Sequence, residues 1–152
     1  MARAPYIAVV GTGEATPEQA ALAEEVGAGL AAAGAVLVTG GLGGVMEAAC
    51  RGARSKHGMT VGLLPGDDRE AANGWVEIAL ATGLGELRNG LIVRAADCIV
   101  AIGGGAGTLS EIALALRLGK QVLGLGTWDV HGVEQVDGAG AAVQRALAVS
   151  AH

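Results

Sequence analysis

The chain has 152 residues, which fits one domain over residues 1–152 with a sizeable core. Its net charge of −5 argues against a broad nucleic-acid-binding face, and two cysteines without a CxxC spacing make no recognisable zinc site. Only 16% of the residues are charged and 51% are hydrophobic, which leaves little surface to solvate and favours self-association.

The first half of the chain predicts strands that alternate with helices. Residues 6–10 are a continuous apolar run, typical of a parallel strand buried on both faces. Thr16, Pro17 and Gln19 have the pattern of a capped helix start, which predicts a helix to about residue 33. Further strands are predicted over 35–39, 59–64 and 76–80, a helix over 45–57, and a polar loop over 67–74.

One segment, residues 26–46, carries no charge and is long enough to span a bilayer. Its repeated glycines divide it into a helix end, a turn, a strand and a loop, so we expect no membrane span. The first apolar run ends at Gly11, which is too short for a signal peptide. We therefore expect a cytoplasmic protein without a membrane partner.

The second half continues the alternation. Helices are predicted over 86–96, 109–118 and 140–149, and strands over 98–102 and 122–125, whereas 128–137 shows no clear pattern. Strands alternating with helices predict a three-layer α/β, Rossmann-like fold with a mostly parallel sheet. The helix LSEIALALRLG is apolar on almost every side, and a sheet covers only one side. We therefore expect a homodimer or homotetramer.

Three glycine clusters, residues 11–13, 40–44 and 103–107, each follow a strand and precede a helix. Such junctions meet at one edge of a parallel sheet, where ligands bind and helix N-termini attract anions. A single cluster is more simply a tight turn, but three that converge favour a phosphate or nucleotide crevice. The candidate ligand-binding residues are Gly11, Gly13, Gly40, Gly41, Gly44, Gly104, Gly105, Gly107 and Thr108.

The common nucleotide and catalytic motifs do not occur. GxGxxG would need glycine where Thr16 or Thr108 stands, which argues against NAD, and there is no P-loop or GxSxG motif. The three histidines have no metal-ligand spacing, so we expect no metal site.

Three polar residues near the third cluster are candidates for ligand contacts. Thr108 is predicted to cap the following helix, and Glu111 to lie in that helix's first turn, facing the glycine loop. Arg88 lies at the start of the preceding helix, on the same edge. The simpler alternatives are a carboxylate that suits the helix dipole and a solvated arginine.

The stretch RNGLIVRAADCIVAIGGGAGTLSE resembles the core signature of the Lonely Guy (LOG) superfamily of Rossmann-like proteins, often labelled lysine decarboxylases. VTGGLGGVMEAA is similar to the second glycine-rich motif of that family. The resemblance aligns Arg88 and Glu111 with residues that, in the family's enzymes, cleave the N-glycosidic bond of nucleoside 5′-monophosphates. It implies that the glycine loop with Thr108 holds the 5′-phosphate.

The sequence departs from the family pattern at three positions, where Gly103, Asn89 and Ser110 replace proline, lysine and glutamate. These changes resemble a shorter branch that includes molybdenum-cofactor carrier proteins, which bind a pterin phosphate. Two functions follow: a binding or carrier protein for a nucleotide-like or pterin ligand, with the molybdenum cofactor as one candidate, or a phosphoribohydrolase with Arg88 and Glu111 as catalytic residues. A pyridoxal-phosphate lysine decarboxylase is rejected, because Lys56 and Lys120 are expected at the opposite edge. A module with an empty crevice is the third alternative.

Overall fold

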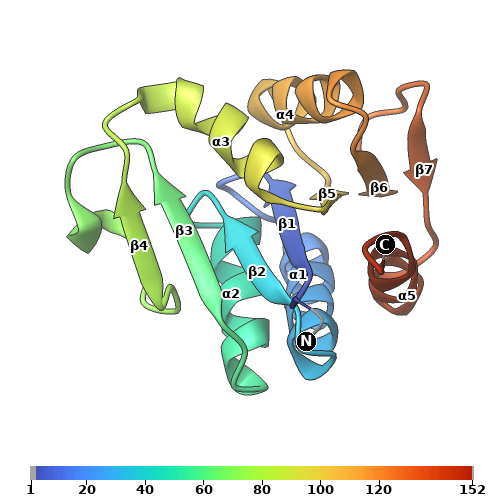
Figure 1. The fold of residues 1–152 in the computed structure, drawn as a ribbon, viewed down its shortest axis with the longest axis horizontal. Helices are drawn as coiled ribbons and strands as arrows, with labels where there is room; N and C mark the ends of the chain where they lie inside the picture. Colours follow the sequence, from blue (N-terminus) through green and yellow to red (C-terminus); the bar gives the residue numbers. More distant parts are fainter. Residues whose placement is uncertain (1–2, 152) are drawn as a thin grey trace.

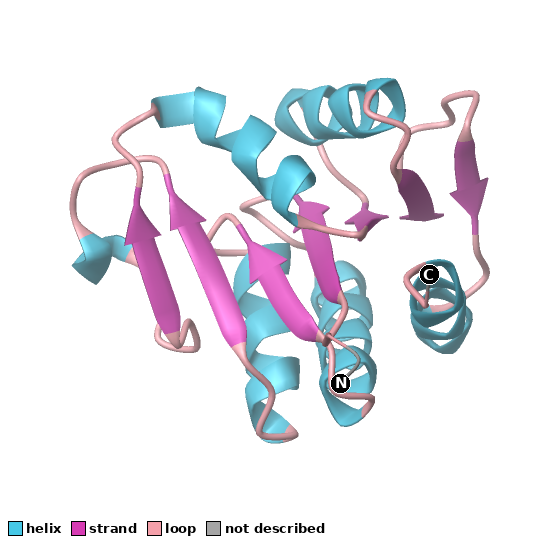
Figure 2. Ribbon diagram, in the orientation of Figure 1, coloured by secondary structure: helices cyan, strands magenta, loops and turns pink. Residues whose placement is uncertain are grey.

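A seven-stranded parallel sheet forms the middle layer of residues 3–151, the part of the chain that the computed structural model describes (Figures 1 and 2). The strands are β1 Tyr6–Gly11, β2 Val36–Thr39, β3 Thr60–Leu64, β4 Ile78–Ala81, β5 Cys98–Ile102, β6 Gln121–Leu125 and β7 Val133–Gln135. The helices are α1 Pro17–Ala32, α2 Val45–Ser55, α3 Arg88–Ala95, α4 Ala106–Arg117 and α5 Ala139–Val149, with short 3-10 helices at Arg69–Ala71 and Gly85–Leu87. The predicted three-layer α/β fold is confirmed.

Two apolar clusters, one on each face of the sheet, hold the layers together. Helices α1, α2 and α5 cover one face, and α3 and α4 cover the other (Figure 1). Successive residues of β1 alternate between them: Ile7 and Val9 pack toward α1 and α2, whereas Ala8 and Val10 pack toward α3 and α4. Because both faces are covered, the central strands are apolar throughout, as the continuous apolar runs predicted.

The strand order is β4-β3-β2-β1-β5-β6-β7. The chain builds outward from β1 to β4, and α3 then carries it back across the sheet to β5, on the other side of β1 (Figure 1). Strands β1 and β5 are parallel neighbours, with Val9 beside Val100 and Gly11 beside Ile102. The order therefore reverses between β1 and β5, the place where open α/β sheets bind ligands.

The helix starts and ends follow local signals to within three residues. Thr16 and Gln19 form the predicted capping box of α1, with both reciprocal hydrogen bonds present. Helix α2 ends at Ser55 rather than at residue 57, because His57 adopts a left-handed backbone conformation with φ 59°. Helix α4 begins at Ala106, three residues before the predicted start, because Gly105 is its N-cap. Thr108 is therefore inside the first turn, and the prediction that it caps the helix is wrong.

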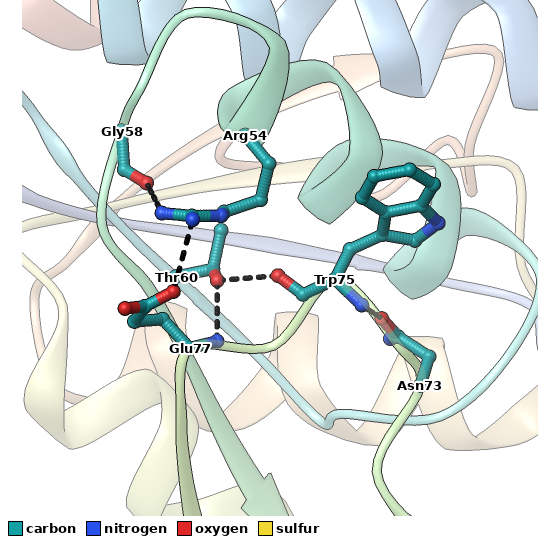
Figure 3. A network of polar contacts seen from close by, with 6 residues as sticks. All are labelled: Arg54, Gly58, Thr60, Asn73, Trp75 and Glu77. Atoms are coloured by element: carbon teal, nitrogen blue, oxygen red, sulfur yellow. Dashed lines mark hydrogen bonds and ion pairs between the residues drawn. The ribbon is translucent and has the colours of Figure 1, made fainter.

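The edge strands differ most from the sequence prediction. Strand β4 covers 78–81 instead of 76–80, and β7 lies in the segment that showed no clear pattern. Figure 3 shows what holds the start of β4: the Thr60 hydroxyl donates to the Trp75 carbonyl (2.6 Å) and accepts from the Glu77 amide (2.8 Å). Arg54 of α2 pairs with the Glu77 carboxylate at 3.1 Å. These contacts join residues up to 23 positions apart, so no local pattern contains them.

Among the described residues, no helix has both the length and the apolar character needed to cross a membrane.

Candidate functional site

A pocket of about 260 Å³ opens where the strand order reverses, and we call it the switch-point pocket. It lies between the loop after β1 and the loop after β5, with the start of α3 across its mouth. The predicted site residues that line it are Gly11, Gly13, Gly40, Arg88, Gly105, Gly107, Thr108 and Glu111. Residues from all three glycine clusters thus meet in one pocket.

The other three predicted residues, Gly41, Gly44 and Gly104, do not line the pocket. They shape its loops. Gly44 has φ 65°, and a Cβ there would lie 2.3 Å from the Thr12 carbonyl oxygen. Gly104 has φ 111°, and a Cβ there would meet the Thr108 side chain at 2.4 Å. A side chain at either position would therefore distort a loop that forms the pocket wall.

The N-terminus of α4 gives one side of the pocket a positive electrostatic character. The amides in the first turn of a helix have no intrahelical partner, and they carry the positive end of the helix dipole. The first backbone bond here runs from the Leu109 amide to the Gly105 carbonyl at 3.0 Å. Gly107 is exposed, and a Cβ there would have no atom within 4 Å. The amides of residues 106–108 donate no hydrogen bond within the described chain, which leaves them free for phosphate oxygens.

Arg88 is the cationic side chain of the pocket. Its Nε donates to the Leu63 carbonyl at the end of β3 (2.8 Å), and its Nη1 donates to the Asn89 side chain. Its Nη2 lies 2.9 Å from the place where a Cβ on Gly40 would stand, so glycine at 40 leaves room for the guanidinium. Desolvation by burial lowers the pKa of Arg88, and the charge of Glu111 opposes that change. The guanidinium is therefore held in place against the second glycine loop.

Glu111 is the carboxylate of the pocket. It is in the second turn of α4 rather than the predicted first, since the helix begins at Ala106. Only 8% of the residue is exposed, yet the described residues contain no hydrogen bond or ion pair to its carboxylate. Burial raises the pKa of Glu111 to about 7, and the nearby Arg88 lowers it by a smaller amount. The group is thus poised between its neutral and charged forms near neutral pH.

Stability should depend on pH through Glu111. Its pKa is about 7 in the folded protein against an ordinary value of 4.5, so the folded state keeps a proton that the unfolded chain releases. Stability is therefore lost as the pH rises from about 4.5 to about 7, by on the order of 3 kcal/mol in total. Urea unfolding of wild type and Glu111→Gln should show the variant gaining relative stability between pH 4.5 and pH 8. A difference that does not change with pH would contradict the raised pKa.

Six pocket residues were not predicted as ligand contacts: Val9, Val10, Thr12, Met46, Asn89 and Ile92. Thr12 lies between two predicted glycines, so its place in the first cluster was the available signal. Asn89 was noted only as a departure from the family pattern, and in the structure it contacts Arg88. Met46 and Ile92 are apolar helix residues, and sequence alone does not separate them from core residues.

Both lysines lie away from the switch-point pocket. Lys56 follows the end of α2, and the Lys120 ammonium donates to the Ala96 carbonyl at 2.6 Å, just before β5. Neither residue lines the pocket. The pocket therefore holds no amine for a Schiff base.

Comparisons with known proteins agree with this architecture. The family described as LDcluster4, the SLOG cluster4 family, matches residues 4–150. An uncharacterized protein of Archaeoglobus fulgidus is 46% identical over 119 residues, which cover 78% of each chain. The molybdenum cofactor binding protein from the phototrophic bacterium Rippkaea orientalis has a TM-score of 0.91 and 37% identity, over 97% of this chain and 98% of that one. The molybdenum cofactor carrier protein MCP from Chlamydomonas reinhardtii has a TM-score of 0.90 and 34% identity, over 99% and 100%. The resemblance predicted from the sequence is confirmed.

Proposed function

This chain belongs to the SLOG cluster4 family, and from that premise we propose that it is a carrier that binds a phosphorylated pterin or nucleotide-like ligand. The observation that carries the proposal is the switch-point pocket, in which residues of three glycine loops and the N-terminus of α4 surround one space of about 260 Å³. The names of the similar structures from Rippkaea and Chlamydomonas support a pterin cofactor, the molybdenum cofactor, as the cargo.

In the proposed complex, the phosphate accepts hydrogen bonds from the first-turn amides of α4, and Gly105, Gly107 and Thr108 line this part of the pocket. Gly11 and Gly13 approach from the loop after β1. Arg88 adds a positive charge across the pocket. The protein's net charge of −5 makes such a local arrangement necessary, because the overall field repels anions.

The second candidate is hydrolysis of a nucleoside 5′-monophosphate to free base and ribose 5-phosphate. It is favoured by one observation, the presence of Arg88 and Glu111 in the same pocket. A carboxylate there would stabilise an oxocarbenium-like sugar and guide water to it. The carrier ranks first because Gly103, Asn89 and Ser110 depart from the enzyme pattern.

Native mass spectrometry of the purified protein, followed by incubation with AMP and GMP, tests both functions. For a carrier we expect a retained ligand mass, or binding of an added phosphorylated ligand, without release of free base. Base release that Glu111→Gln abolishes would overturn the carrier in favour of the hydrolase. Failure of every phosphorylated ligand to bind at millimolar concentration would contradict both.

We also propose that a second copy of the chain covers exposed apolar side chains of Ile78 and Leu80 in β4, Leu84 and Leu87 just before α3, and Leu91 in α3. These five side chains are exposed, and Leu87 is 77% exposed. Ile78 and Leu80 stand beside Val61 and Leu63, which pack on the α3 face, so these two side chains extend that face to the sheet edge. Light scattering should give a multiple of 14.9 kDa that Leu87→Asp reduces. A monomeric wild type would contradict this.

A further inference from the structure

Glu111 presents a problem that the phosphate site does not explain. A carboxylate at 8% exposure, without a partner among the described residues, lies in a pocket built for an anion. No fully buried side-chain oxygen or nitrogen lacks a partner in the described chain, so the Glu111 oxygens keep some exposure, and Glu111 lines the switch-point pocket. Burying such a group without a partner costs free energy, and a bound ligand is the partner that the pocket leaves room for.

The position of Glu111 on α4 separates it from the phosphate seat. It follows Ala106 by five residues, which places its Cα about 7.5 Å farther along the helix axis. A phosphate held by the amides at the helix start therefore leaves Glu111, farther along α4, for another part of the same ligand. An ionised carboxylate is an acceptor only, so the ligand end that meets it must carry hydrogen-bond donors.

The apolar side chains that line the pocket favour a planar ring, rather than a sugar, as the part of the ligand that meets Glu111. Met46 and Ile92 line the same pocket, and Met46 is only half-buried. Their apolar side chains suit the faces of a planar heterocycle, whereas sugar hydroxyls would lose hydrogen bonds to water against them. The pocket thus combines the N-terminus of α4, which suits an anion, with apolar side chains and one hydrogen-bond acceptor, the Glu111 carboxylate.

We propose, resting on the ligand-binding function above, that the Glu111 carboxylate recognises an aminopyrimidinone edge. This edge, a ring N–H beside an exocyclic amino group, is shared by guanine and by pterins. Its two adjacent donors match the two oxygens of one carboxylate. Adenine has one donor beside a ring acceptor, and hypoxanthine lacks the amino group, so each can give Glu111 only one of the two hydrogen bonds. Glu111 is in this assignment a specificity residue.

Calorimetric titration at pH 8 with GMP, IMP, AMP, neopterin monophosphate and ribose 5-phosphate tests the assignment. At this pH Glu111, with a pKa of about 7, is mostly ionised. We expect GMP or neopterin monophosphate to bind at least tenfold more tightly than IMP and AMP, and the tighter of the two identifies the ring. Glu111→Gln should remove the preference and leave the affinity for ribose 5-phosphate within about twofold. The control Glu14→Gln, an exposed glutamate at the same edge, should change neither.

Equal affinity of GMP and IMP, with the pterin no tighter than either, would overturn the assignment while the phosphate site stands. An equal loss of GMP and ribose 5-phosphate binding in Glu111→Gln would also overturn it, because Glu111 would then contact the sugar-phosphate part. If neither ribose 5-phosphate nor any ring ligand binds, the proposed function itself fails.

Discussion

Replacing Gly107 with aspartate should reduce the affinity for ribose 5-phosphate about 100-fold and leave the fold intact. Gly107 is the second residue of α4, lines the switch-point pocket and has no atom within 4 Å of an added Cβ. A carboxylate about 5 Å from the bound phosphate repels it by on the order of 3 kcal/mol at an effective dielectric constant near 20. Titration calorimetry of the variant and the wild type measures the change.

Gly140→Asp is the matched control. Gly140 is the second residue of α5, follows a glycine N-cap as Gly107 does, is exposed and has no atom near an added Cβ. Both substitutions place a negative charge at a helix N-terminus, which stabilises the helix by a few tenths of a kcal/mol. Only Gly107→Asp should lose binding. Unchanged binding in that variant would place the phosphate elsewhere.

Replacing Gly27 with alanine should lower the free energy of unfolding by about 3 kcal/mol and Tm by about 10 °C. Helices α1 and α2 pack with their backbones in contact: a Cβ on Gly27 would lie 2.0 Å from the Ala49 carbonyl oxygen. The reciprocal contact has the same distance, since a Cβ on Gly52 would lie 2.0 Å from the Glu24 carbonyl oxygen. The neighbour is backbone and cannot rotate away, so the helices must separate and lose their shared core contacts.

Calorimetry or urea unfolding measures this effect, with Gly140→Ala as the comparison. That alanine meets no atom within 4 Å and gains helix propensity, so its Tm should stay the same or rise slightly. A Gly27→Ala protein as stable as wild type would show that the two helices can move apart at little cost.

Much of the fold could be predicted because its signals are local. The apolar run at 98–102 predicted β5 with its final bounds, and the Thr16–Gln19 capping box set the start of α1. The edge strands were harder, because β4 is held by contacts of Thr60 with Trp75 and Glu77 across the chain (Figure 3). Strand β7 is only three residues long and was not predicted.

The candidate site also contains some residues that a local motif predicted and others that only helix packing brings together. Gly105, Gly107, Thr108 and Glu111 share one helix start, so a single motif predicted all four, although the exact first residue of the helix was misplaced. Met46 and Ile92 come from α2 and α3, and only the packing of those helices brings them to the pocket. Their apolar side chains look like core residues until the pocket is known.

The sequence by itself determined the layered α/β class, the three glycine turns and the helix that follows the third of them. These features depend on residues close together in the chain, where backbone preference and apolar periodicity act. Only the tertiary structure decided that the strand order reverses between β1 and β5, and that Arg88 and Glu111 therefore face one pocket. The tertiary structure also buries Glu111 and so raises its pKa to about 7, because desolvation depends on every segment packed around the carboxylate.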